Sequence, residues 1–485
     1  MTPARPRAHR ALLAYVVAVG LPLLALLAVL RLGAGLHPTG AAPAPPAPLA
    51  VPPPPVAAGA GAAALDVPLL LLQVAVVLAA ARLAGRAARH LGQPQVVGEM
   101  LAGILLGPSV LGALAPAAAA SLFPPASLGF LNALSQLGLV LFMFVVGLEL
   151  DPALLRGRGR TALVTSHASI AVPFVLGAAL AILLYPTLAP RGVPFAEFAL
   201  FMGAAMSVTA FPVLARILTE RRLVGTRLGA VALACAAVDD ATAWCILAGV
   251  VALVRAPAST LPLWATAAGT ILLAALVLGP VRRALDALGR RVRADGRLGE
   301  DVLALLLLAA LAAAWTTERL GVHALFGAFL VGVAVPKRDG LAAALSARFQ
   351  DLMVVLLLPL FFAFTGLRTR VGLIAGGTLW AWCGLVTAVA VAGKFGGSAL
   401  AARATGMAWR EAGALGALMN TRGLMELVIL NVGLDLGVLS PTLFAMMVLM
   451  ALATTLMTTP LLERLYPETR AARAPAPRAA APAGR

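Results

Sequence analysis

Two adjacent aspartates and one lysine are the residues of this chain best placed to do chemistry. Asp239 and Asp240 interrupt one long apolar run, and Lys394 interrupts another. An ionisable side chain deep in a bilayer is costly and by default indicates a functional site. Neighbouring helical residues point about 100° apart, so one aspartate can line a cavity while the other pairs with a fixed partner.

The lysine has a property that arginine lacks. Lys394 is one of only two lysines among 37 basic residues, and a buried lysine can lose its proton whereas an arginine effectively cannot. A lysine that faces one of the two aspartates makes a pair whose proton can be exchanged for an ion. The alternative is a lysine that extends along the helix to the inner membrane surface.

Two further apolar runs carry polar residues and helix breakers at their centres. Residues 195–218 include Ser207, Thr209 and Pro212, and a proline removes one backbone hydrogen bond. Residues 410–435 include Asn420, Thr421, Arg422 and Glu426. Backbone groups freed at that depth must face protein or a water-filled cavity. We predict two broken helices, with Arg422 and Glu426 paired at i, i+4 as a structural support. A simple kink is the alternative.

The available ligands suit one class of ion. Carboxylates, hydroxyls and backbone carbonyls are hard oxygen donors, and no cluster of thiols or imidazoles supplies a transition-metal site. These donors therefore predict a small alkali cation as the ion, and no cofactor.

Composition requires these residues to lie in a membrane. The chain has 485 residues, of which 61% are apolar and 12% charged, whereas soluble domains have about 25% charged residues. The net charge of +17 would suggest nucleic acid on a soluble domain. Here the basic residues lie between apolar runs, as in membrane loops. This pattern excludes a soluble enzyme and predicts an all-α polytopic membrane protein in a lipid bilayer, with no nucleic-acid partner.

The apolar runs predict a leader at residues 11–30 and thirteen further spans. These are residues 66–88, 95–113, 129–149, 162–187, 195–218, 226–254, 262–285, 298–318, 322–336, 350–370, 374–403, 410–435 and 440–462. With the N-terminus inside, inner segments hold 29 Lys and Arg and outer segments hold 6. Positive charge favours the cytoplasmic side, so both termini are predicted to be cytoplasmic unless the leader is cleaved.

The expected organisation has four parts. Residues 1–36 are expected to form either a signal anchor or a cleaved signal peptide. Residues 37–65 form an Ala/Pro-rich linker, residues 66–465 the transmembrane domain, and residues 466–485 a disordered cytoplasmic tail.

Two parts of the membrane domain resemble each other. Residues 97–103 resemble 326–332, residues 142–148 resemble 361–367, and residues 203–207 resemble 416–420. These matches pair spans 2, 3 and 5 with spans 9, 10 and 12. An offset of seven predicts two six-helix units joined by one helix, with the second unit inverted. Inverted repeats with broken helices that cross at mid-membrane are a secondary-transporter architecture.

The motifs together resemble the monovalent cation:proton antiporters. Within that family the similarity is to bacterial sodium/proton antiporters, potassium-efflux antiporters and plant cation/proton exchangers. It rests on residues 92–99, 207–216, 238–240 and 420–427, with Gly107-Pro108-Ser109. The resemblance implies a core domain of spans 4–6 and 11–13 that moves against a panel. It also implies a homodimer and a pair between Asp239 and Lys394. The monovalent cation would bind at Asp240 and Asp239, with oxygens from Thr209 and Ser207.

The resulting hypothesis is a secondary antiporter, not an enzyme, that exchanges Na⁺ or K⁺ for protons by alternating access. Such a protein would serve ion transport and pH homeostasis in a bacterial inner (plasma) membrane. The alternative is a cation channel or a channel-like potassium efflux protein. An intramembrane enzyme is disfavoured, because no nucleophile–base constellation accompanies the aspartates. Sodium or potassium selectivity and electrogenic or electroneutral stoichiometry both remain open.

Overall fold

A computed structural model describes residues 20–38, 66–149, 159–224, 226–256, 261–295, 299–337 and 340–467. In these ranges the regular structure is helical throughout. Eleven helices are long and apolar enough to cross a membrane, and one bent pair makes a twelfth span. The predicted 37–65 linker and 466–485 tail lie almost wholly outside the described residues, as does the first part of the leader.

One predicted span is shorter than expected. Residues 322–336 contain the helix α14 (Ala324–Ala334), which has only 11 residues. At about 1.5 Å per residue this helix is shorter than the hydrocarbon core of a bilayer, so the passage of residues 322–336 through the membrane stays a prediction. The part of the leader that the structure describes is a helix over Gly20–Gly33, whose Val29 contacts the buried core.

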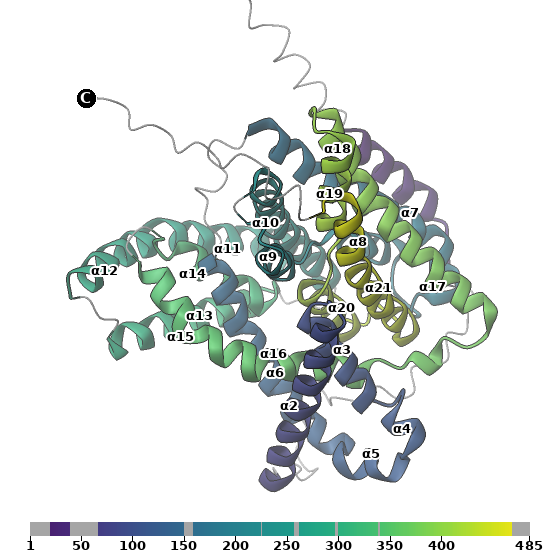
Figure 1. Cartoon of the computed structure of the whole chain (residues 1–485), viewed down its shortest axis with the longest axis horizontal. Helices are drawn as coiled ribbons and strands as arrows, with labels where there is room; N and C mark the ends of the chain where they lie inside the picture. Colours follow the sequence, from purple (N-terminus) through teal and green to yellow (C-terminus); the bar gives the residue numbers. More distant parts are fainter. Residues whose placement is uncertain are drawn as a thin grey trace, which may run out of the picture.

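The helices pack in two groups, which lie on different sides of Figure 1. The first, here called the panel, contains α2 (Val67–His90), α3 (Gln95–Leu106), α6 (Pro125–Glu149), α13 (Glu300–Arg319), α14, α15 (Leu341–Leu352) and α16 (Leu358–Arg368). The helices α11 (Leu263–Leu276) and α12 (Arg282–Asp295) flank it, and the short helices α4 (Leu111–Leu114) and α5 (Pro116–Leu122) follow α3.

The second group, here called the core domain, carries the aspartates and Lys394. It contains α7 (Gly159–Leu188), α8 (Phe195–Ser207), α9 (Phe211–Glu220), α10 (Arg227–Arg255), α17 (Gly376–Val391), α18 (Gly397–Ala404), α19 (Trp409–Met419), α20 (Leu424–Asp435) and α21 (Pro441–Leu465). These segments correspond to spans 4–6 and 11–13, the set that the family resemblance implied.

Glycines allow equivalent helices of the two sequence units to pack closely. A Cβ added to Gly366 of α16 would lie 2.1 Å from the backbone of Gly103 in α3, and one added to Gly332 of α14 would lie 2.9 Å from Gly147 in α6. Gly103 aligns with Gly332, and Gly147 aligns with Gly366. Exchanging the two sequence units therefore converts one contact into the other. The inverted orientation of the units stays a prediction, which these matched contacts favour.

Both predicted breaks are present, with a different role for the proline. The chain is unwound over residues 208–210 between α8 and α9, and α19 and α20 are bent by 43° at their break. Pro212 lies in the first turn of α9, where its missing N–H costs no hydrogen bond. It therefore starts the second half-helix rather than interrupting a continuous one. The freed groups meet, since the Ala210 N–H donates to the Thr421 carbonyl at 3.0 Å.

Candidate functional site

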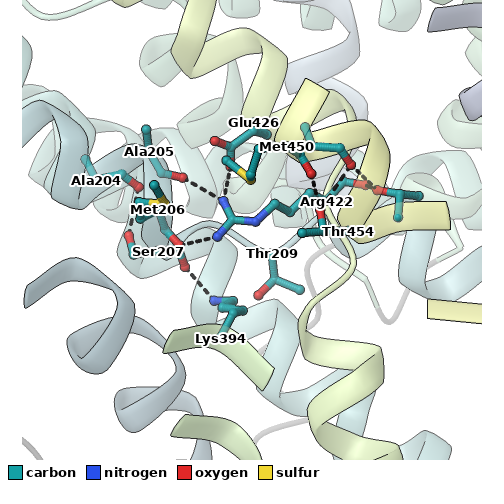
Figure 2. A network of polar contacts seen from close by, with 12 residues as sticks. Ala204, Ala205, Met206, Ser207, Thr209, Lys394, Arg422, Glu426, Met450 and Thr454 are labelled. Atoms are coloured by element: carbon teal, nitrogen blue, oxygen red, sulfur yellow. Dashed lines mark hydrogen bonds and ion pairs between the residues drawn. The ribbon is translucent and has the colours of Figure 1, made fainter. Parts of the chain in front are cut away.

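The crossing of the two broken helices is held by a buried arginine. Arg422 is fully buried and donates to the carbonyls of Ala205 and Met206, at 3.0 and 2.6 Å, and to Glu426 at 2.6 Å. The two carbonyls lie at the C-terminal end of α8, where the helix dipole favours a cation. Figure 2 shows Arg422 reaching from its own break to the end of α8. The predicted Arg422–Glu426 pair is thus present and joins the two broken helices.

Lys394 occupies a π-helical turn over Ala392–Gly396, between α17 and α18. Such turns insert one residue into a helix and are frequent at functional sites. The lysine is fully buried, and its ammonium donates to the Ser169 carbonyl at 2.8 Å, to the Ser207 carbonyl and to Asp239 at 3.0 Å. These three acceptors use its three N–H donors. Lys394 is therefore a second cation at the C-terminal end of α8.

Asp239 has a complete set of hydrogen-bond donors. One carboxylate oxygen accepts from the Ser166 hydroxyl at 2.7 Å. The other accepts from the Ser169 hydroxyl, from Thr209 at 2.9 Å and from Lys394 at 3.0 Å. The predicted ion pair with Lys394 is present, and both of its side chains are fully buried. Charge-assisted bonds of this kind favour an ionised carboxylate in a fixed position.

Asp240 has the opposite environment. Its side chain is 2% exposed, and neither carboxylate oxygen accepts a hydrogen bond from the described residues. The Phe211 N–H at the start of α9 makes at most a weak backbone hydrogen bond to it, which falls outside standard hydrogen-bond distance and angle. Buried polar groups are nearly always bonded. A buried carboxylate without donors is therefore suited to bind a proton or a desolvated cation.

The other predicted residues lie at the crossing with different contacts. The Ser207 hydroxyl donates to the Ala204 carbonyl of its own helix, so Ser207 faces Lys394 through its carbonyl alone. Thr421 lies 3.4 Å from the Thr458 hydroxyl. Both amide atoms of Asn420 are buried without a partner among the described residues.

Ser166 and Ser169 were not anticipated, although both donate to Asp239. Their sequence signal is a pair of hydroxyls at i, i+3 in the apolar run 162–187. Residues at that spacing lie on one helix face. Hydroxyls are common in membrane helices, however, so only the packing of α7 on α10 distinguishes this pair.

A family model matches most of the chain. Residues 74–464 match the model described as sodium/hydrogen exchanger, transmembrane. The chain belongs to this family. It is 44% identical over 395 residues to the Na(+)/H(+) antiporter NhaS4 of Synechocystis, a match that covers 81% of this chain and 96% of that protein.

Two other relatives are longer proteins. Cation/H(+) antiporter 17 of Arabidopsis thaliana is 43% identical over 81% of this chain and 48% of its own length. K(+)/H(+) antiporter 1 of Saccharomyces cerevisiae is 35% identical over 82% of this chain and 46% of its own length. The chain thus spans about half the length of these two relatives.

A solved structure has the same fold. The sodium proton antiporter MjNhaP1 of Methanocaldococcus jannaschii matches with a TM-score of 0.59 at 14% identity, over 84% of this chain and 99% of that one. This likeness supports the arrangement of the membrane helices described above.

Proposed function

We propose that this protein is a secondary antiporter that exchanges a monovalent cation, Na⁺ or K⁺, for protons by alternating access. The observation that carries the proposal is Asp240, a carboxylate buried beside the broken helices that accepts no hydrogen bond of standard geometry from the described residues. One such carboxylate binds either a proton or a cation, because each neutralises the same charge. That competition couples the two fluxes in opposite directions.

The residues around Asp240 have complementary roles in this proposal. Asp239 and Lys394 form a fixed pair at the end of α8, and Thr209 orients Asp239. Asn420 offers an unpartnered amide oxygen at the other break, so we assign it as a further cation ligand. Arg422 and Glu426 hold the two breaks together and do not contact the ion.

The proposed setting is a homodimer in a bacterial inner membrane, with both termini in the cytoplasm. The support for the orientation is the bias of 29 inner against 6 outer basic residues. The support for a bacterial membrane is the cyanobacterial relative. The homodimer rests on the family resemblance.

The test is exchange by the purified protein in vesicles. Vesicles with an acidic interior and a pH-sensitive dye should report proton release when Na⁺, K⁺ or Li⁺ is added outside. Asp240→Asn should abolish this signal, because an amide binds neither a proton nor a cation in exchange. The control is Asp66→Asn, which changes an exposed N-cap of α2 to another good capping residue and should exchange normally.

Each outcome is decisive. Normal exchange by a correctly inserted Asp240→Asn protein contradicts the assignment of the site. A cation current without coupled proton movement in the unmodified protein contradicts antiport and favours a channel. A dye response that depends on membrane voltage marks the exchange as electrogenic.

A further inference from the structure

A pair of charges joins the core domain to the panel at one end of the molecule. Arg368 ends the panel helix α16, and Asp435 ends the core helix α20. Their side chains form an ion pair at 2.5 Å, and Arg368 also donates to Asn431 of α20 at 3.1 Å. We call Arg368 and Asp435 the outer latch, since the proposed orientation places them outside. This latch must open if the core domain moves against the panel.

A second ion pair crosses the same boundary with reversed polarity. Arg255 ends the core helix α10 and pairs at 2.9 Å with Glu318 of the panel helix α13. Glu318 also accepts from the Ala324 N–H, at the start of α14. At this end the panel therefore presents one cation and one anion, and the core domain presents their partners.

The sequence repeat gives each of these residues an equivalent at the opposite end. Gly366-Leu367-Arg368 aligns with Gly147-Leu148-Glu149. Ser207 and Asn420 are the aligned last residues of the matched segments 203–207 and 416–420. Arg222 lies fifteen residues after Ser207, and Asp435 lies fifteen residues after Asn420. An arginine–aspartate pair at one end thus corresponds to a glutamate and an arginine at the other. Both signs are reversed.

The register of the first matched segments, 97–103 with 326–332, has structural support. A Cβ added to Gly98 would lie 2.2 Å from the Ala84 carbonyl, and one added to Gly327 would lie 2.1 Å from the Ala313 carbonyl. Each alanine precedes its glycine by fourteen residues. The same register aligns Glu318 with Arg89, which is a third reversal of sign.

The equivalent residues are not paired with each other in this structure. Among the described residues, Glu149 and Arg222 make no ion pair, and both are exposed. The neighbouring Arg221 pairs within the core domain, with Glu463 of α21 at 2.5 Å. The charges at this end therefore do not connect the core domain to the panel through Glu149 and Arg222, whereas the outer latch is formed.

We propose that Glu149 and Arg222 form an inner latch in the state in which the outer latch is open. The inference rests on the proposed alternating access. It goes beyond that proposal by naming the pair that joins the core domain to the panel at the inner end. Exposed ion pairs contribute little free energy each, which suits contacts that break and re-form in every cycle. The panel contributes the arginine of the outer latch and the glutamate of the inner latch. Each panel residue therefore attracts only its own partner in the core domain, and each latch belongs to one state.

The test is cross-linking in a protein without native cysteines, with Cys235, Cys245 and Cys383 replaced by alanine. We expect a short thiol-reactive cross-linker to join Arg368→Cys to Asp435→Cys, and in separate molecules to join Glu149→Cys to Arg222→Cys. Each cross-link should reduce exchange at least tenfold, with recovery when a cleavable linker is reduced. The control, Arg221→Cys with Glu463→Cys, joins two core helices and should leave exchange unchanged.

Mutual exclusion is the sharper measurement. In a protein that carries all four latch cysteines, mass spectrometry should find one cross-link or the other on each chain and never both. Glu149→Arg and Arg222→Glu should each slow exchange, and the double variant should recover most of it. Both cross-links on one chain, no 149–222 cross-link during turnover, or a double variant as slow as the singles would overturn the proposal. Failure of the unmodified protein to exchange would instead contradict the proposed function.

Discussion

At the scale of the residue, two adjacent aspartates have opposite surroundings. Asp239 accepts from three hydroxyls and an ammonium, whereas Asp240 has no donor among the described residues. Removing a hydrogen-bonded carboxylate from its partners costs free energy, whereas a buried carboxylate without partners gains free energy when it binds a cation or a proton. We therefore propose that Asp239 gives structural support and that its neighbour Asp240 exchanges the ion.

Replacement of Lys394 tests this division. Lys394→Arg keeps the charge but should transport at least tenfold more slowly or lose the voltage-driven component. A planar guanidinium does not reproduce three tetrahedral N–H bonds and does not release its proton. Charge movement per cation, recorded in vesicles on a solid support, is the measurement. Unchanged charge movement would contradict a role for the lysine proton. Asp66→Asn, at the exposed N-cap of α2, is the control and should transport normally.

Removal of the lysine charge tests the ion pair itself. Lys394→Gln leaves Asp239 as a buried charge without its cation, which should cost about 3–5 kcal/mol of stability. Thermal unfolding in detergent measures this loss. A second change, Asp239→Asn in the Lys394→Gln protein, should recover part of it because the unpaired charge is gone. We further expect Lys394 to leave Asp239 in another state of the cycle, which a structure of that state would show.

At the scale of the element, the two half-helix ends create the site. The C-terminal end of α8 offers three carbonyls, which two buried cations from distant segments bind. Each break is three or four residues long, and the two breaks bond to each other through Ala210 and Thr421. Unwound backbone at membrane depth is stable only where protein satisfies it. The crossing is therefore a single cooperative unit.

The close packing of α3 on α16 also depends on a glycine. A Cβ on Gly103 would lie 2.7 Å from the Ala363 Cα and the Phe362 carbonyl. Gly103→Ala should therefore force α3 from α16 and cost about 1–3 kcal/mol, as overpacking does. The control is Gly384→Ala in α17, where an added Cβ meets nothing within 4 Å and should not lower stability. Midpoints of thermal unfolding compare the two, and equal midpoints would contradict the close approach.

At the scale of the whole molecule, the core domain and the panel are separate packing units that share one boundary. Most contacts lie within each group, and the outer ion pairs Arg255–Glu318 and Arg368–Asp435 cross between them. Weak exposed pairs and few shared contacts leave the boundary free to slide. This arrangement suits a transporter in which one body carries the ion past the other.

The orientation of the whole molecule has its own test. Arg282, Arg283, Arg290, Arg291, Arg293 and Arg297 lie between spans 7 and 8 and form the largest basic cluster between spans. In a cysteine-free background, Arg290→Cys should be protected from an impermeant thiol reagent in intact cells and label after lysis. Arg191→Cys, in the loop between α7 and α8, should label in intact cells. The reverse pattern would invert the topology.

Several features of the protein follow from local properties of the sequence. Long apolar runs determine the membrane spans, because the cost of unsatisfied backbone in lipid leaves helices as the solution. Asp239, Asp240 and Lys394 are identifiable as a site because charge at that depth is costly wherever the helices pack. Pro212 marks one break because a proline lacks an N–H. The polar run at 420–422 marks the other because polar groups at membrane depth must be satisfied by protein or water. Each of these inferences needs only a residue and its neighbours in the chain.

The family resemblance paired Asp239 with Lys394, and the remaining partners were decided by the tertiary structure. Nothing local distinguishes Asp239 from Asp240, or shows that Ser166 and Ser169 donate to the first while the Ser207 hydroxyl turns back to its own helix. The short α14, too, takes its place in the panel from its packing on α6 and α13. Which face of α10 meets α7 depends on how both helices are rotated. That rotation is set by side-chain packing between segments far apart in sequence, such as Gly393 against Pro173.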